Sequence, residues 1–213
     1  MSKDDHRPSV FLVDDDAAIC RALSRGLTAE GFTVRCWNSA RAFLDEHDPT
    51  APGCLVTDVA MPGVNGLELQ KLLATSGCAR PIVFITGRGS IPMSVQAMRA
   101  GAVNFLPKPV RLAELVAAIR EAFDRDARVR QLGAQRAAVE SRLTALTTRE
   151  REVLDLVVAG KMNKQIAAEL GAAEKTIKVH RGRVMRKMQV RSVAELVTLT
   201  AELAGHPEKP GAA

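Results

Sequence analysis

The chain has 213 residues and no apolar run near the roughly 18 needed to span a bilayer, which predicts one or two water-soluble domains. Its first residues, MSKDDHRPS, are polar and lack the basic and then apolar pattern of a secretory signal, so we expect a cytoplasmic protein without a membrane partner. Aromatic residues make up 3% of the chain, which argues against a stacking platform for single-stranded nucleic acid. The formal net charge of +6 indicates affinity for polyanions.

The four cysteines, Cys20, Cys36, Cys54 and Cys78, form no C-x-x-C pair and have no histidine nearby. We therefore expect reduced, partly buried thiols rather than a disulfide framework or a zinc site.

Charge and proline content divide the chain into two unlike parts. Residues 1–125 hold 14 Lys/Arg and 14 Asp/Glu, whereas residues 126–213 hold 16 and 10, so the second part carries the whole surplus. Eight of the ten prolines lie in the first 109 residues and none lies between 110 and 206, which leaves the second part free to be helical. The composition predicts two domains.

Short apolar runs alternate with segments of helical period in the first part. The runs predict five strands, at 10–13, 33–37, 54–57, 82–86 and 104–106. Helices are expected at about 17–30, 40–46, 66–75 and 90–100, with a fifth beginning near 111. This alternation predicts a parallel sheet with helices on both faces, and such sheets bind ligands beyond the carboxyl ends of their strands.

Polar residues follow several of these strands. Three carboxylates, Asp14, Asp15 and Asp58, would repel one another at the sheet edge, and a bound Mg²⁺ would relieve the repulsion. Lys108 offers a compact cation and Thr86 a hydroxyl to phosphoryl oxygens. The set predicts phosphoryl transfer onto a carboxylate, with Asp58 as the acceptor because it ends the central strand.

One long helix is expected from about 111 to 146. Ten positions spaced by three and four, eight of them apolar, form a stripe along it: Leu115, Ala118, Ala122, Arg125, Val129, Leu132, Arg136, Val139, Leu143 and Leu146. The stripe could form a short coiled coil or pack on its own domain. The two arginines and Gly133 weaken the coiled-coil interpretation.

Four helices are predicted in the last 70 residues. Thr147 and Glu150 have the spacing of a capping box before the first, Asn163 is expected to cap a second at 164–170, and the others span 173–188 and 193–203. A short helix, a glycine turn and a basic helix together predict a helix-turn-helix.

The basic helix carries six positive charges and one negative charge over residues 174–188. Its apolar face holds Ile177 and His180, the latter interpreted as a packed core residue, and the opposite face is predicted to contact duplex DNA. Lys178 and Val179 are placed to reach base edges, while Arg181 and Arg183 are expected at phosphates. The predicted DNA-contacting residues are Lys175, Thr176, Lys178, Val179, Arg181, Gly182, Arg183 and Arg186.

The segments VFLVDDD, LVTDVAMPGVNGLEL, IVFITGRG and AGAVNFLPKP resemble, in order and spacing, those of a response-regulator receiver over residues 9–125. The resemblance implies a flavodoxin-like α/β domain with a five-stranded parallel sheet in the order 2-1-3-4-5. The site residues it implies are the metal ligands Asp14, Asp15 and Asp58, the phosphoacceptor Asp58, the phosphoryl sensors Thr86 and Lys108, and the aromatic switch residue Phe105. Ala60 departs from the bulkier side chains usual at its position, which leaves the phosphoryl lifetime open.

The segments LTTREREVLDLVVAGKMNKQIAAEL and EKTIKVHRGRVMRKMQVRSVAELV resemble a NarL/FixJ (LuxR-type) effector over residues 146–197. This resemblance implies an all-α four-helix domain that binds double-stranded DNA as a dimer, with the fourth helix forming much of the dimer contact. Gly182 departs from the longer side chains common there. We expect a receiver at 1–125, a helical linker at 126–143 and a DNA-binding domain at 144–213.

These features together predict a two-component transcription regulator. A sensor histidine kinase would phosphorylate Asp58 in the presence of Mg²⁺, and the DNA-binding domain would then be released, dimerised or both. The partners implied are the kinase, promoter DNA, a second copy of the chain and, as a further candidate, RNA polymerase. The protein would be a phosphoryl acceptor with at most slow self-dephosphorylation, not an enzyme.

Two alternatives stay open. One is a constitutive DNA binder with an inert receiver. The other is a phosphohydrolase of the haloacid-dehalogenase type, suggested by Asp14-x-Asp16 after a strand and disfavoured by Ala18, where that family has Thr or Val. If the chain is instead a two-component regulator, Asp16 is expected to cap the helix that follows it.

Overall fold

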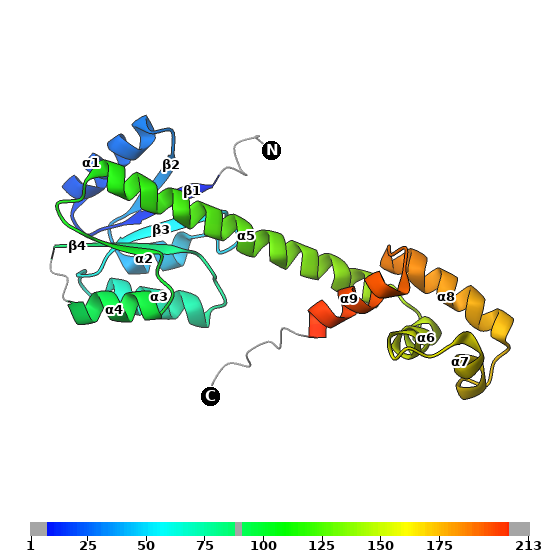
Figure 1. The fold of residues 1–213 in the computed structure, drawn as a ribbon. Helices are drawn as coiled ribbons and strands as arrows, with labels where there is room; N and C mark the ends of the chain where they lie inside the picture. Colours follow the sequence, from blue (N-terminus) through cyan, green and yellow to red (C-terminus); the bar gives the residue numbers. More distant parts are fainter. Residues whose placement is uncertain (1–7, 88–90, 205–213) are drawn as a thin grey trace. The chain divides into compact units, whose positions relative to one another are not determined.

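The computed structural model describes residues 8–87 and 91–204, and the chain divides into two compact units between Arg130 and Gln131. Figure 1 shows the helices and strands of each unit. The first unit thus extends beyond residue 125, where composition placed the end of the first domain. Among the described helices, none combines the length and the apolar character needed to cross a bilayer.

Strands and helices alternate through the first unit, as the sequence predicts. Its strands are β1 (Ser9–Val13), β2 (Thr33–Trp37), β3 (Gly53–Asp58), β4 (Ile82–Thr86) and β5 (Asn104–Pro107). Its helices are α1 (Ala17–Ala29), α2 (Ala40–Glu46), α3 (Gly66–Thr75), α4 (Ile91–Arg99) and the first part of α5 (Leu112–Thr144). The start expected for α4, at residue 90, lies outside the described residues.

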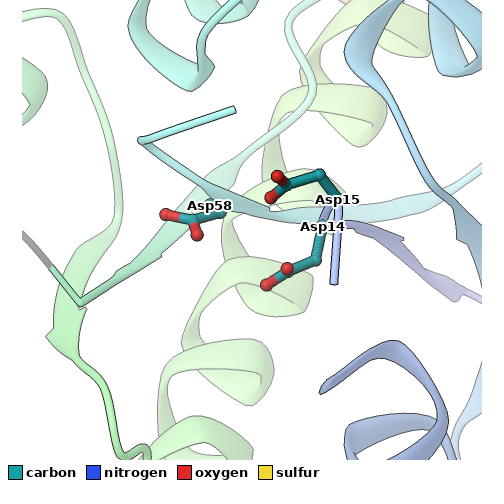
Figure 2. Close-up of side chains that lie close together, drawn as sticks. All are labelled: Asp14, Asp15 and Asp58. Atoms are coloured by element: carbon teal, nitrogen blue, oxygen red, sulfur yellow. The ribbon is translucent and has the colours of Figure 1, made fainter. Parts of the chain in front are cut away.

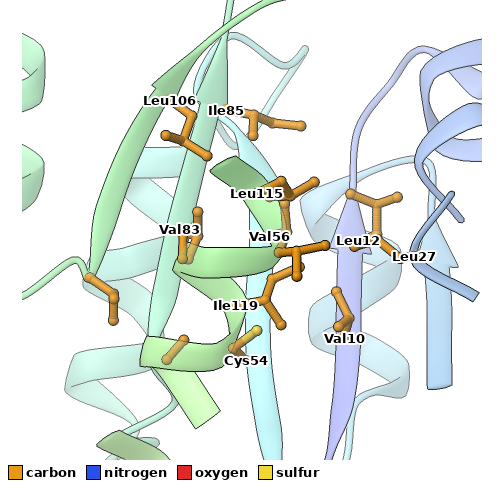
Figure 3. Close-up of a cluster of buried hydrophobic side chains, with 14 of the residues drawn as sticks. Val10, Leu12, Leu27, Cys54, Val56, Val83, Ile85, Leu106, Leu115 and Ile119 are labelled. Carbon is orange, nitrogen blue, oxygen red and sulfur yellow. The ribbon is translucent and has the colours of Figure 1, made fainter. Parts of the chain in front are cut away.

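All neighbouring strands pair in parallel, in the order β2-β1-β3-β4-β5, which confirms the expected topology. Every residue of β3 and β4 is buried, because helices cover both faces of the sheet. One apolar cluster packs α1 and α5 against one face, with Leu115 and Ile119 of α5 over the central strands (Figure 3). A second cluster packs α2, α3 and α4 against the other face.

The register places the carboxyl ends of β1 and β3 side by side. Val13 pairs with Thr57, so Asp14 and Asp58, the next residue along each chain segment, come to the same edge of the sheet. The fold therefore brings together carboxylates that are far apart in the sequence.

Two residues of α5 tie this helix to the first residue of β3 and to the loop before it. Asp126 is 5% exposed and accepts a hydrogen bond from the backbone N–H of Gly53 at 2.9 Å. Arg130 donates from Nε to Asp126 Oδ2 at 2.7 Å and from its two terminal nitrogens to the carbonyls of Thr50 and Ala51. These bonds place residues up to Arg130 in the first unit.

The apolar stripe predicted along α5 contributes residues to the apolar cores of both units. Leu115 and Ala122 are buried against the sheet, whereas Val139 is buried in the core of the second unit. Between these segments Val129 is 43% and Leu132 65% exposed. Much of the stripe therefore packs within the two units, which leaves a short exposed seam for a coiled coil.

Over residues 131–204, the part of the second unit that the structure describes, the chain forms the end of α5 and four further helices. These are α6 (Thr148–Val158), α7 (Asn163–Glu169), α8 (Glu174–Met188) and α9 (Val193–Ala204). Each contributes to one apolar cluster, in which Val153, Ile166, Ile177 and Leu196 are fully buried. Thr147 and Glu150 form the predicted capping box at the start of α6.

Candidate functional site

Three carboxylates meet at the carboxyl edge of the sheet, beyond β1 and at the end of β3. Figure 2 shows Asp14, Asp15 and Asp58 grouped there, and a ligand atom from each lies within 4.8 Å of the others. Asp14 is fully buried, Asp58 is 6% exposed and Asp15 is exposed. An all-oxygen set of this kind suits a hard divalent cation such as Mg²⁺.

Lys108, just after β5, bridges two of the acids. Its Nζ lies 2.6 Å from Asp14 Oδ2 and 2.6 Å from Asp58 Oδ2. The other oxygen of each acid accepts a backbone N–H at 3.0 Å, that of Asp16 for Asp14 and that of Ala60 for Asp58. The backbone and a single ammonium thus orient both carboxylates.

Burial and charge act in opposite directions on this group. Desolvation raises the pKa of Asp14, and the hydrogen bonds from Lys108 and from the Asp16 amide only partly offset it. For Lys108, desolvation lowers the pKa, but bonds to Asp14 and Asp58 outweigh it and hold the pKa above its ordinary value. A buried carboxylate with a raised pKa gains from an added cation, so the site fits a metal ion.

The two predicted switch residues lie near the same edge. Thr86 ends β4, is 2% exposed, and its carbonyl accepts the backbone N–H of Lys108 at 2.8 Å. Phe105, in β5, is half-buried against the cluster beneath α4, with its ring centroid 6.1 Å from that of Phe84. Asp14, Asp15, Asp58, Thr86 and Lys108 therefore lie at the carboxyl end of the sheet, whereas Phe105 pairs with Phe84 in the middle of β4.

Asp16 caps helix α1, as expected for a two-component regulator. Its Oδ1 accepts from the amides of Ala18 at 2.7 Å and Ile19 at 3.3 Å. The Asp16 carboxylate is thereby committed to the helix and does not act as a further metal ligand beside Asp14, Asp15 and Asp58.

Sequence reasoning missed Gly66, the first residue of α3. Its N–H donates to the carbonyl of Val59 at 3.0 Å, and a Cβ at this position would lie 2.3 Å from the carbonyl oxygen of Asp58. A glycine is needed for α3 to start this close to the acceptor strand. The motif NGLEL contains that glycine, but only the fold shows what it meets.

In the second unit, α8 has an exposed basic face. Lys175, Thr176, Lys178, Gly182, Arg183 and Arg186 are exposed, and Val179 is 48% exposed. The opposite face is apolar, with Ile177, Val184 and Met188 buried. His180 is half-buried, and its Nδ1 is buried without a hydrogen-bond partner among the described residues.

Arg181 differs from its expected neighbours on this helix. It is half-buried, and its Nη1 donates to Asn163 Oδ1 at 2.9 Å. The expectation that Asn163 caps α7 is wrong, because Met162 occupies the cap position and Asn163 lies in the first turn. Its side chain instead holds α8 against α7, the two helices of the helix-turn-helix.

Lys187 is the basic residue of α8 that the predicted interface omits. Its Nζ donates to Glu150 Oε2 at 2.6 Å and to the carbonyl of Ala145 at 3.0 Å. The bond to Lys187, together with the Thr147 amide, lowers the pKa of Glu150 to about 2. This cation joins α8 to α6 and has a structural role.

Comparison with known proteins identifies both parts. Residues 10–120 match the response regulator receiver domain, and residues 144–200 match the luxR family of bacterial regulatory proteins. The chain is 44% identical to nodulation protein W of Bradyrhizobium diazoefficiens, over 94% of this chain and 89% of that protein. It is 42% identical to the transcriptional regulatory protein FixJ of Azorhizobium caulinodans, over 92% of each. The solved structure of the response regulator StyR matches with a TM-score of 0.85 and 46% identity, over 92% of this chain and 99% of that one.

Proposed function

The chain is a two-component transcriptional regulator of the NarL/FixJ response-regulator family, and on this basis we propose that phosphorylation of Asp58 controls its binding to promoter DNA. The observation that carries the proposal is the position of Asp58. It ends the central strand β3 at a carboxylate-rich sheet edge, with Lys108 Nζ 2.6 Å from its Oδ2.

The reaction is a direct transfer between two side chains. An oxygen of Asp58 forms a bond to phosphorus as the bond to a kinase histidine nitrogen breaks, and the imidazole leaves. Lys108 offsets negative charge at the acceptor, and the Ala60 amide orients the carboxylate through its 3.0 Å bond. The product is an acyl phosphate on Asp58, so the chain acts as a phosphoryl acceptor rather than a turnover enzyme.

Asp14, Asp15 and Asp58 would hold Mg²⁺ in this reaction. A cation held by these residues would supply positive charge to offset that of the transferring phosphoryl oxygens. Asp14 supports this role because its carboxylate is fully buried and has a raised pKa.

The phosphorylated state is read by residues around the acceptor. Thr86 supplies a hydroxyl at this edge and Phe105 a half-buried ring on the neighbouring strand β5, and we propose that both shift when the phosphoryl group binds. The change favours release and dimerisation of the DNA-binding unit, which then acts at promoters with RNA polymerase. DNA binding and contact with a kinase imply a cytoplasmic location.

On α8 the exposed residues make the DNA contacts. Lys178 and Val179 lie on the face opposite the buried Ile177 and are proposed to meet base edges, with Arg183 and Arg186 at phosphates. Arg181 is held by Asn163, so we propose that it supports the helix pair and reaches at most one phosphate.

Labelling of the full chain tests the proposal. The protein is incubated with acetyl phosphate with and without Mg²⁺, and phosphorylated chains are separated on a phosphate-affinity gel. Wild type should be labelled only with Mg²⁺, Asp58→Asn should not be labelled, and the matched control Asp45→Asn, an exposed acid on α2, should behave as wild type.

DNA binding completes the test. Binding to promoter fragments should tighten on labelling of wild type and not change for Asp58→Asn. Binding without Mg²⁺-dependent labelling would support the inert receiver instead. Repeated hydrolysis of a phosphomonoester, abolished by Asp14→Asn but not by Asp58→Asn, would support the phosphohydrolase.

A further inference from the structure

Two cysteines lie on the same face of the receiver sheet at the same level. Cys36, in β2, pairs in register with Leu12 of β1. Residues paired in neighbouring parallel strands point to the same face. Leu12 and Cys20 belong to the cluster that packs α1 and α5 onto that face. The side chain of Cys36 is therefore directed toward the face covered by α1, which carries Cys20.

The contacts of the Cys20 sulfur show that α1 lies close to the end of β2, next to Cys36 in the sequence. Its S–H lies 3.4 Å from the carbonyl oxygen of Asp14 and 3.9 Å from that of Trp37, the residue after Cys36. The two thiols also interact electrostatically. Burial raises the pKa of Cys20 to about 11, and the neighbouring Cys36 contributes to the rise.

The two thiols differ in their access to solvent. Cys36 is exposed, contrary to the partial burial expected for all four cysteines, whereas Cys20 is 8% exposed. Cys54 and Cys78 are buried at other positions and neither is paired in the sheet with Cys36. A diffusing oxidant would therefore meet Cys36 first, with Cys20 as the thiol beside it.

We propose that Cys20 and Cys36 form a reversible intramolecular disulfide when the receiver meets a hydroperoxide. The sulfur of Cys36 attacks one peroxide oxygen, the O–O bond breaks, and Cys36 becomes a sulfenic acid while the other oxygen leaves as an alcohol or water. The sulfur of Cys20 then attacks that of Cys36 and displaces hydroxide, which leaves as water with the Cys20 proton. Two thiols are oxidised by two electrons and one peroxide is reduced.

The bond would change the surroundings of the acidic pocket. It would join α1 covalently to the edge strand β2 and would remove the S–H donor that faces the Asp14 carbonyl. This modification site is separate from the proposed phosphorylation and does not depend on it.

Peptide mapping of the full chain tests the proposal. The protein is treated with hydrogen peroxide, free thiols are blocked with iodoacetamide, and the chain is digested with trypsin without reductant. Cleavage after Lys3, Arg21, Arg35 and Arg41 places Cys20 in residues 4–21 and Cys36 in residues 36–41, apart from the other two cysteines. We expect the two peptides joined, at a mass two hydrogens below their sum, and separated by dithiothreitol.

Single substitutions make the result specific. Cys36→Ser, at an exposed position, should abolish the linked peptide, and the matched control Cys78→Ser should retain it. The proposal is overturned if wild type gives no disulfide-linked peptide of residues 4–21 and 36–41. In that case Cys36 would be found as a sulfinic acid, or joined to a second chain, to Cys54 or to Cys78.

Discussion

The ammonium nitrogen of Lys108 lies 2.6 Å from Oδ2 of Asp58, a residue 50 positions earlier in the chain. The same nitrogen lies 2.6 Å from Oδ2 of Asp14. A positive charge thus already occupies the space between two proposed metal ligands. A metal ion entering this pocket must compete with it.

We expect Lys108→Gln to bind Mg²⁺ more tightly than wild type, by about tenfold, equivalent to roughly 1.4 kcal/mol. The substitution removes a cation that repels the metal and occupies carboxylate oxygens. Isothermal titration calorimetry measures the affinity, and Lys71→Gln, an exposed lysine on α3, controls for net charge. Unchanged or weaker binding in Lys108→Gln would contradict the proposed competition.

Asp126→Ala should destabilise the first unit by about 1–3 kcal/mol, because the buried N–H of Gly53 loses its acceptor. Trp37 is the one tryptophan in the sequence and is buried in this unit, so its fluorescence during urea unfolding reports the loss. Asp124→Ala, two residues away and exposed, is the control and should leave the midpoint within error. Equal effects from both would mean that the bond to Gly53 contributes nothing.

The stability of the second unit should depend on pH through Glu150. Its bond to Lys187, with that of the Thr147 amide, lowers its pKa from 4.5 to about 2. Since the folded-state pKa is lowered, the stabilisation is complete above 4.5 and is lost as pH falls through about 2. The advantage of wild type over Glu150→Gln should shrink over this window.

Thermal unfolding followed by NMR of core methyl groups, such as those of Val153, measures that difference. Glu152→Gln replaces an exposed acid of the same helix and should show no such window. A difference between wild type and Glu150→Gln that stays constant from pH 5 to 2 would refute the role of the carboxylate charge.

Two substitutions on α8 separate base contacts from phosphate contacts. Lys178→Ala should relax the preference among operators, whereas Arg183→Ala should weaken binding to all duplexes about equally and lower the salt slope by about 1. Both residues are exposed, so neither change should disturb the core. Fluorescence anisotropy with matched and scrambled duplexes at several salt concentrations tests this, and equal losses across sequences for both variants would reject the assignment.

Much of the receiver could be predicted from sequence because its signals are local. β2 and β4 lie where apolar runs predict them, and Asp14 and Asp58 each follow or end such a run. The carboxyl ends of parallel strands lie at the same edge of a sheet, so residues at these ends can be placed together from the sequence alone. The pocket was therefore predictable from the order of the strands.

The remaining contacts depend on tertiary packing. Asp126 meets Gly53 across 73 positions, and Lys187 meets Glu150 across 37. A helical pattern gives the face of a residue but not its partner on another element. For the same reason Arg181 looks like a free phosphate contact in sequence, although Asn163 accepts its hydrogen bond.

The close approach of Gly66 to the carbonyl of Asp58 has a consequence for mutational surveys of this protein. Any side chain at position 66 would have to push α3 away from the strand that presents the acceptor. In a scan of all substitutions, changes at position 66 should reduce activity about as strongly as changes at Asp58 and Lys108, although Gly66 contributes no functional group. Intolerance at that position would report the space around the acceptor rather than chemistry.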